Sequence, residues 1–254
     1  MSFAVAHSMA QAPPDSGSPM SYKYFDRIMA LFITVLLVSN IASSAKIVDW
    51  GVSILGIPLA YDAGTLLFPI SYIFGDVLTE VYGYRHSRRV IWTGFACALL
   101  MSMTLWLVGL LPGEAYWQAN VGQSAYLAVL GGVSSGAIVA ASLAAYWAGE
   151  FSNSFILAKM KIITRGRWLW ARTLGRTLVG QGIDTLLFVT LATWFGVPGF
   201  VPEIWLTLIL TNYIFKVGVE GIMTPVTYRV VNRLKRVENE DFYDYHTNFN
   251  PFKG

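Results

Sequence analysis

Six apolar segments of membrane-spanning length dominate this sequence. They cover residues 26–45, 62–82, 90–111, 127–150, 174–195 and 203–226. An α-helix needs about 20 apolar residues to cross the hydrocarbon core of a bilayer, and each segment has about that length. Backbone polar groups in lipid must be satisfied within the segment that carries them, which favours helices. The sequence therefore predicts an all-α polytopic membrane protein, a six-transmembrane-helix bundle.

The composition agrees with this prediction. Hydrophobic residues make up 55% of the 254 residues and charged residues only 13%, about half the charged share of a typical soluble domain. The formal net charge of +3 does not indicate nucleic acid binding, because the basic residues lie in short clusters between apolar segments. The single cysteine, Cys97, cannot form an internal disulfide, and the sequence contains no metal-ligand spacing.

The regions outside the apolar segments predict two tails and one extended connection. Residues 1–22 are rich in Pro, Ser and Gly, which predicts a disordered cytoplasmic tail. Residues 23–230 are expected to form the transmembrane domain and residues 231–254 a polar cytoplasmic tail. Residues 46–61 mix β-branched residues with Gly and Pro, which favours a short hairpin or extended lid between the first two helices. We assign no function to this connection.

The distribution of lysine and arginine predicts the orientation in the membrane. With the N terminus in the cytoplasm, the outer connections contain only Lys46. The inner segments contain Lys23, Arg27, Arg85, Arg88, Arg89, Lys159, Lys161, Arg165, Arg167, Arg172, Arg229, Arg233, Lys235 and Arg236. Because basic residues are retained on the cytoplasmic side, both termini are expected to lie in the cytoplasm.

Ionisable and polar side chains recur inside these segments. Asp76 and Glu80 are four residues apart, so on a helix they share one face, roughly 6 Å apart. Pro69, in the same segment, is expected to bend it. An ionisable residue inside a span indicates function by default, because burying its charge in lipid is costly. The other segments contribute Glu150 and Asn153, then Arg176, Gln181 and Asp184, and finally Asn212, Lys216 and Glu220.

These side chains allow two interpretations. They could pair with one another only to neutralise buried charge. Acids, amides and a lysine from several helices fit better with a wet cavity that binds a solute. A carboxylate with Asn or Gln amides can bind the N–H donors and the carbonyl of a guanine-like heterocycle, and Tyr72, Phe68 or Phe188 could stack on its plane.

Other classes of function lack the residues that they need. His7, His86 and His246 all lie outside the apolar segments, and the sequence contains neither an H-E-x-x-H motif nor a phosphate-binding loop for ATP. We therefore expect neither an enzyme nor a bound cofactor. A channel is possible, but mixed charges and amides suit recognition of a small solute better than ion flow.

Five sequence motifs resemble one known family. They are FPISYIFGDVLTEVYGYRHSRRVIW at residues 68–92, GEFSNS at 149–154, RTLVGQGIDTLLF at 176–188, NYIFKV at 212–217 and YDYHTNFNPF at 243–252. In this order they resemble the queuosine precursor transporter family. The resemblance implies a bacterial inner-membrane protein that imports 7-cyano- or 7-aminomethyl-7-deazaguanine for salvage into tRNA queuosine.

The resemblance, together with the polar and ionisable residues of the apolar segments, suggests two groups of functional residues. Substrate binding is assigned to Asp184, Gln181, Lys216, Asn212, Tyr72 and Asn153. A gate or proton-coupling role is assigned to Asp76, Glu80, Arg176, Glu150 and Glu220. In this hypothesis Asp184 and Gln181 read the N–H edge of the base, and Lys216 donates to its carbonyl or holds Asp184 in place.

Several alternatives remain open at this point. The chain could be the substrate-capture subunit of a vitamin uptake system that needs a separate ATP-driven module, or a carrier for another purine-like or vitamin solute. An ion channel is the third class. The sequence also leaves open which precursor is preferred, whether transport is coupled to protons, and whether the chain forms a homo-oligomer in the lipid bilayer.

Overall fold

The fold was analysed in a computed structural model, which describes residues 22–54, 57–196 and 200–253. The predicted N-terminal tail lies outside the described residues except for Tyr22. The elements in chain order are α1 (Phe25–Ala45), β1 (Ile47–Ile54), β2 (Ile57–Asp62), the 3-10 helix η1 (Ala63–Leu67), α2 (Phe68–Tyr82), α3 (Tyr84–Leu110), α4 (Ala115–Asn120), α5 (Gly122–Ser134), α6 (Gly136–Ile163), α7 (Leu169–Trp194), the 3-10 helix η2 (Pro202–Ile204) and α8 (Trp205–Glu238).

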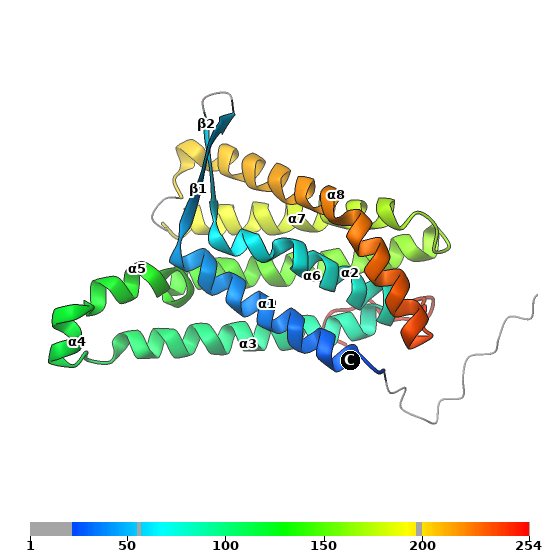
Figure 1. Cartoon of the computed structure of the whole chain (residues 1–254), viewed down its shortest axis with the longest axis horizontal. Helices are drawn as coiled ribbons and strands as arrows, with labels where there is room; N and C mark the ends of the chain where they lie inside the picture. The colour runs from blue at the N-terminus through cyan, green and yellow to red at the C-terminus, as the bar shows by residue number, and fades with distance from the viewer. Residues whose placement is uncertain (1–21, 55–56, 197–199, 254) are drawn as a thin grey trace, which may run out of the picture.

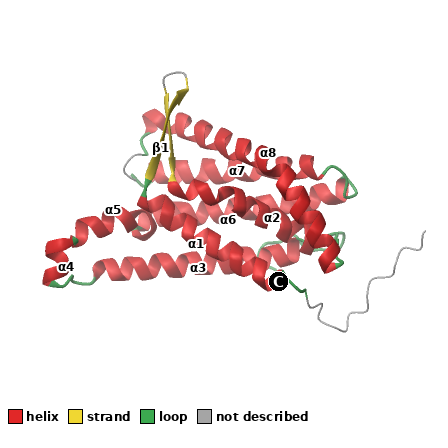
Figure 2. Ribbon diagram, viewed as in Figure 1, coloured by secondary structure: helices red, strands yellow, loops and turns green. Residues whose placement is uncertain are grey.

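The long helices extend along the same axis of an elongated, predominantly helical molecule (Figures 1 and 2). α6 packs against α7, α7 against α8, and α2 against both α6 and α8. α1 and α3 pack against each other and against α2 on the other side of the bundle. As a result, α2, α6, α7 and α8 surround one interior region, where the candidate site lies.

Four stretches of the described residues are long and apolar enough to cross a membrane. They are α1, α3, the stretch Gly122–Ile163 that contains α5 and α6, and the stretch Pro202–Glu238 that contains η2 and α8. These stretches indicate a multi-pass membrane protein. The predicted count of six spans is not confirmed, because α2 has only 15 residues, or about 22 Å of helix, and α7 carries Arg172, Arg176 and Asp184.

Several predicted boundaries differ from the structure. The segment predicted at 127–150 is divided into α5 and α6 at Ser135, whose backbone is extended. α6 continues to Ile163 and α8 to Glu238, beyond the predicted ends at Glu150 and Val226. An apolar run indicates only the part of a helix that suits lipid, whereas these helices continue where charged side chains pair with one another.

The bend predicted at Pro69 is wrong. α2 begins at Phe68, so Pro69 lies in its first turn, where the missing backbone N–H has no intrahelical acceptor to lose. The proline that lies in a helix interior is Pro225 of α8. Figure 1 shows α8 changing direction along its length, as expected for a helix with an internal proline.

The connection between α1 and α2 contains two antiparallel strands. β1 pairs with β2 in a register that joins Ile47 to Asp62 and Ile54 to Ile57. Residues 55 and 56, between the two strands, lie outside the described residues. The ribbon projects sideways from the helices near the ends of α1, α7 and α8 (Figure 1), so it lies away from the charged interior described below.

The C-terminal segment, residues 239–253, folds back onto the helices. The Phe242 backbone N–H donates to the Val81 carbonyl, and the Asp244 carboxylate accepts from the Tyr84 N–H at 3.1 Å. Arg88 donates to the carbonyls of Asn248 and Asn250. The polar tail predicted from residue 231 onward is therefore the end of α8 followed by an ordered segment.

Candidate functional site

Polar and charged side chains from four helices meet in the interior. This group, the central cluster, contains Tyr72 and Asp76 of α2, Glu150 and Asn153 of α6, Arg176 and Asp184 of α7, and Lys216 and Glu220 of α8. We include Gln181, which is buried one turn before Asp184 on α7. Two ion pairs of 2.5 Å cross between helices, one joining Arg176 Nε to Asp76 Oδ1 and the other joining Lys216 Nζ to Asp184 Oδ2.

Helical spacing explains why these residues meet. Tyr72 and Asp76 are one turn apart on α2, as are Lys216 and Glu220 on α8. α7 runs antiparallel to α8, so Asp184 faces Lys216 at one level and Arg176 faces Glu220 at the next. Most of the polar residues predicted on these separate segments thus come together in one place.

Arg176 lies at the centre of the more buried half of the cluster. It pairs with Asp76, lies 3.9 Å from Glu220 Oε2 and donates to the Tyr72 carbonyl at 3.2 Å. Asp76 and Glu220 are completely buried and lie side by side. One guanidinium therefore compensates two carboxyl groups in a region without solvent exposure.

The charges of the central cluster do not balance. Four carboxyl groups, of Asp76, Glu150, Asp184 and Glu220, share two cationic groups, of Arg176 and Lys216. Excess negative charge in a buried region favours binding of a proton or of a ligand that brings hydrogen-bond donors. The arrangement can therefore do more than neutralise its own charges.

The Asp184–Lys216 pair is the more accessible half. The Asp184 side chain is 23% exposed and that of Lys216 is 15% exposed, in contrast to the fully buried Asp76. Gln181, one turn before Asp184, and Asn153 of α6 are both buried beside this pair. A carboxylate and an ammonium group that solvent can reach thus lie next to two buried amides.

Two glycines allow α6 and α7 to approach closely at this level. A Cβ atom at Gly149 would lie 2.8 Å from Cβ of Asp184, and a Cβ at Gly180 would overlap the Asn153 amide. Larger residues at either position would push apart the helices that carry Glu150, Asn153 and Asp184. The backbone of both helices therefore shapes the cluster.

A second group, the end cluster, lies where the four helices terminate. Glu80 of α2 is completely buried and pairs with Arg172 of α7 at 2.9 Å and with Lys235 of α8 at 2.7 Å, while Lys161 of α6 lies at 3.7 Å. Lys161 and Lys235 also pair with Asp241 of the C-terminal segment, at 2.5 and 2.7 Å. Five segments are joined through these charges.

The structure separates residues that the sequence placed together. Glu80 belongs to the end cluster, whereas Asp76, four residues before it, belongs to the central cluster. Asn212 is not brought into either cluster, because it is exposed and its amide donates to the Leu208 carbonyl of its own helix. The other predicted site residues all lie in one of the two clusters.

Sequence reasoning missed Lys161, Arg172, Lys235 and Asp241. Lys161 and Arg172 were placed in a loop, but both are helical and almost completely buried. It also missed Thr177 and Thr185, whose buried hydroxyls make no hydrogen bond within the described residues. Their spacing of four residues on either side of Gln181 is a signal that could have identified the two threonines.

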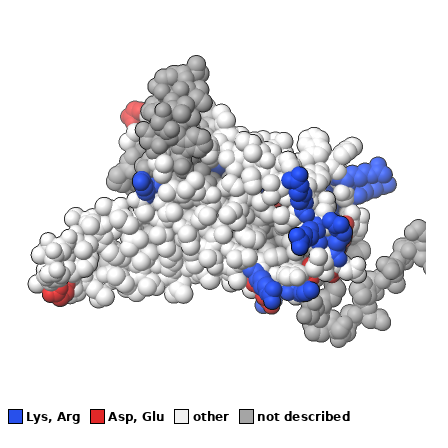
Figure 3. Space-filling view, viewed as in Figure 1, with Lys and Arg blue, Asp and Glu red and all other residues white. Residues whose placement is uncertain are grey.

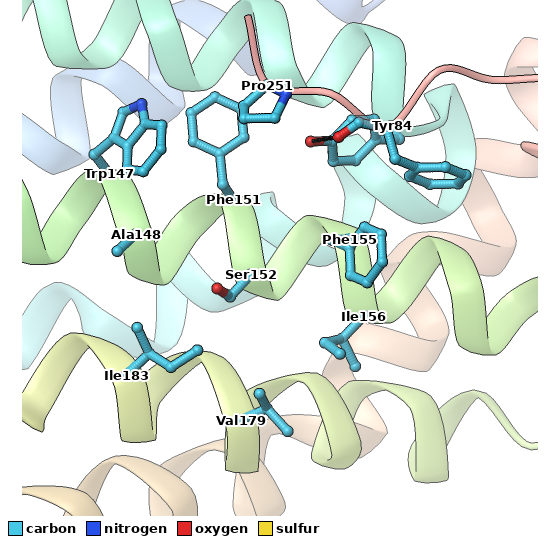
Figure 4. Close-up of a pocket in the computed structure, with 11 residues that line it drawn as sticks. Tyr84, Trp147, Ala148, Phe151, Ser152, Phe155, Ile156, Val179, Ile183 and Pro251 are labelled. Carbon is cyan, nitrogen blue, oxygen red and sulfur yellow. Dashed lines mark hydrogen bonds between the residues drawn. The ribbon is translucent and has the colours of Figure 1, made fainter.

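Two open surface pockets among the described residues lie away from both clusters. One of about 390 Å³ lies on the surface of α6 between the C-terminal segment and α7 (Figure 4), bordered by Tyr84, Phe151, Phe155 and Phe249. The other, of about 710 Å³, lies beside Trp92, Trp147 and Phe252. Both are lined mainly by apolar side chains, so they suit lipid rather than a polar solute.

Together, the membrane-spanning stretches and the charged interior define a polytopic membrane protein with the features of a solute carrier. The chain belongs to the family described as "Putative vitamin uptake transporter", whose model matches residues 62–230. It is therefore a transporter and not an enzyme.

Curated relatives resemble the chain over most of its length. The "Queuosine precursor transporter" of Escherichia coli (strain K12) is 29% identical over 81% of this chain and 87% of its own. The "Probable queuosine precursor transporter" of Bacillus subtilis (strain 168) is 26% identical over 82% of this chain and 85% of its own. A protein of the same name from Haemophilus influenzae (strain ATCC 51907 / DSM 11121 / KW20 / Rd) is 26% identical over 66% of this chain and 67% of its own. No solved structure matches the chain significantly.

Proposed function

We propose that this chain imports queuosine precursors, the 7-cyano- and 7-aminomethyl-7-deazaguanines, across the bacterial inner membrane for salvage into tRNA. The names of the three relatives support this substrate class. The observation that carries the proposal is the partly exposed Asp184–Lys216 pair beside Gln181 and Asn153. These groups have the chemistry that a deazaguanine requires.

The base would be read by complementary hydrogen bonds. A guanine-like ring presents adjacent N–H donors and one carbonyl, so the Asp184 carboxylate would accept from the donors while an amide of Gln181 or Asn153 completes the edge. Lys216 would either donate to the carbonyl or keep Asp184 ionised and oriented. Tyr72 would contribute its ring from α2.

The buried half of the central cluster would serve as gate or proton site. Asp76 and Glu220 share Arg176, and Glu150 lies near both Arg176 and Lys216. Movement of a proton onto one of these carboxyl groups would release Arg176 from one partner and weaken the link between α2, α7 and α8. Glu80 would have the same gating role in the end cluster, where the helices end.

The charge distribution supports an orientation with both termini in the cytoplasm and with all six predicted segments crossing the bilayer. Lys and Arg side chains gather at one end of the molecule, where α6 and α8 terminate, whereas the opposite end shows few of them (Figure 3). A basic end is the expected cytoplasmic end. The end cluster would then face the cytoplasm.

The proposal can be tested by rescue in cells. Bacteria unable to make the precursor, and lacking their own importer, would receive nanomolar 7-deazaguanines with or without this chain, and queuosine would be measured in tRNA by mass spectrometry. We expect queuosine only when the chain is present. If the chain inserts into the membrane and tRNA still lacks queuosine, the substrate assignment is wrong.

A substrate-capture subunit is the second candidate. The description of the family as one of vitamin uptake favours it, because uptake proteins of this size can work with a separate ATP-driven module. Such a subunit would bind the precursor without accumulating it. A carrier would accumulate it in liposomes that contain only this chain.

A further inference from the structure

We propose that Asp241, in the C-terminal segment, is a gating residue that holds the end cluster closed. The proposal rests on the proposed function in one respect, that the chain alternates between states in which this end is closed and open. It concerns a residue outside the membrane helices. It also gives the C-terminal segment a role in transport.

The first argument is charge. In the end cluster, Glu80 alone would face three cations, Lys161, Arg172 and Lys235. Asp241 supplies the second carboxylate and contacts Lys161 and Lys235 at 2.5 and 2.7 Å. Without it, two lysines would repel each other across the junction of α6 and α8, because Lys161 is almost fully buried and solvent screens it poorly.

The second argument is the anchoring of Asp241. On its N-terminal side it lies three residues after the end of α8, and the Glu240 N–H donates to the Lys235 carbonyl. On its other side, Lys161 Nζ donates to the Phe242 carbonyl at 2.7 Å, and the Phe242 N–H donates to Val81 of α2. The backbone contacts on both sides thus fix the position of the Asp241 carboxylate.

The anchoring continues along the segment. Asp244 is buried and binds the N–H of Tyr84 at the start of α3. Pro251 accepts from Trp92 Nε1 at 2.9 Å, and the Phe252 ring stacks on Trp147 of α6 with centroids 5.5 Å apart. The C-terminal segment therefore contacts α2, α3 and α6 and remains attached to α8.

The third argument is position. The end cluster joins the same four helices that carry the central cluster, and Arg172 lies one turn before Arg176 on α7, about 6 Å along the axis. A solute leaving the central cluster at this end must part these helices. The Asp241 side chain is 46% exposed, more than that of any other member of the end cluster. Breaking its ion pairs therefore leaves the least uncompensated charge buried away from water.

The charge state of Asp241 is compatible with ion pairs that form at neutral pH in the closed state. Burial raises its pKa, but hydrogen bonds and charges from Lys161 and Lys235 outweigh burial and hold the pKa below the usual range. Its stabilising contribution is thus fully present above the ordinary Asp pKa of about 3.9 and is lost only at lower pH. Opening at neutral pH must come from movement of the helices.

The test measures access to a buried reporter next to the end cluster. Thr173 is completely buried beside Arg172, so Thr173→Cys would be introduced with Cys97→Ala, and the chain would be labelled in nanodiscs with a membrane-impermeant maleimide. Asp241→Asn removes the charge and keeps the shape. Glu240→Gln is the matched control, because Glu240 is adjacent in sequence and has no ion pair within 4 Å among the described residues. Asp241→Glu is the conservative variant.

We expect Asp241→Asn to increase the labelling rate roughly fivefold, as loss of two partly exposed ion pairs from the closed state implies. Glu240→Gln and Asp241→Glu should label like the parent chain. Equal rates in all four chains would overturn the proposal. Labelling does not depend on which solute is carried, so failed uptake of 7-deazaguanines by the parent chain would reject the proposed function alone.

Discussion

Arg176 illustrates how a single residue connects the helices of this transporter. Its guanidinium pairs with Asp76, lies near Glu220 and donates to the Tyr72 carbonyl. All of these groups are buried. The Arg176 side chain therefore offsets the free-energy cost of burying two carboxyl groups. Removal of Arg176 would leave that cost uncompensated.

Arg176→Gln should destabilise the protein strongly. Breaking a buried ion pair by removing one partner leaves uncompensated charge and costs about 3 kcal/mol or more. The melting temperature of the detergent-solubilised chain should fall, and that of Arg229→Gln, at an exposed position of α8, should not change. If Arg176→Gln and Arg229→Gln had the same melting temperature, the burial of Asp76 and Glu220 would not require the Arg176 charge.

Asp184→Asn tests the proposed base-reading residue. Asparagine keeps the size of the side chain but replaces one acceptor oxygen with a donor, so a charge-assisted hydrogen bond to the substrate is lost. Affinity for 7-aminomethyl-7-deazaguanine, measured by calorimetry, should fall by roughly 10- to 100-fold. Asn232→Asp is a useful comparison, because Asn232 is exposed near the basic end of α8 and lies in neither cluster. Unchanged affinity in Asp184→Asn would reject the assignment.

At the scale of elements, the contact between α6 and α7 shapes the site. Gly149→Ala would place a Cβ atom 2.8 Å from Cβ of Asp184, which should cost about 1–3 kcal/mol of stability or displace Asp184. Thermal unfolding and substrate affinity should both be measured. Gly218→Ala on α8 is the control, since a Cβ there meets nothing within 4 Å. Identical behaviour of the two variants would contradict the close helix approach.

Some elements of the site could be predicted from sequence because their signals are local. The spacing of Asp76 and Glu80, and of Lys216 and Glu220, indicates shared helix faces without any knowledge of the partners. The pairing itself could not be predicted, since Glu80 pairs with Arg172, at a position that sequence reasoning assigned to a loop. Hydropathy ends a segment where charge begins, but α6, α7 and α8 continue through charged turns.

The C-terminal segment was missed for a similar reason. Its polar composition is typical of a solvated tail, yet several of its contacts use carbonyl groups, such as those of Asn248, Asn250 and Pro251. Backbone acceptors are present in every sequence and give no signal. The predicted helical membrane architecture is sound at the coarse level, whereas contacts distant in sequence required the structure.

At the scale of the whole molecule, the charge asymmetry predicts opposite labelling of the two ends. In right-side-out vesicles, an impermeant thiol reagent should label Gln118→Cys on α4 and leave Asn232→Cys on α8 unlabelled, because the basic end is expected in the cytoplasm. Both positions are exposed in the structure, so both should label in detergent. The reverse pattern would invert the proposed orientation.

The most direct test of the central claim is uptake by the purified chain alone. Liposomes that contain only this protein should accumulate radiolabelled 7-aminomethyl-7-deazaguanine with saturable kinetics, and unlabelled 7-cyano-7-deazaguanine should compete. Such accumulation would establish a self-sufficient carrier for queuosine precursors. Saturable binding without accumulation, or no interaction at all in liposomes where the folded chain is present, would contradict that claim.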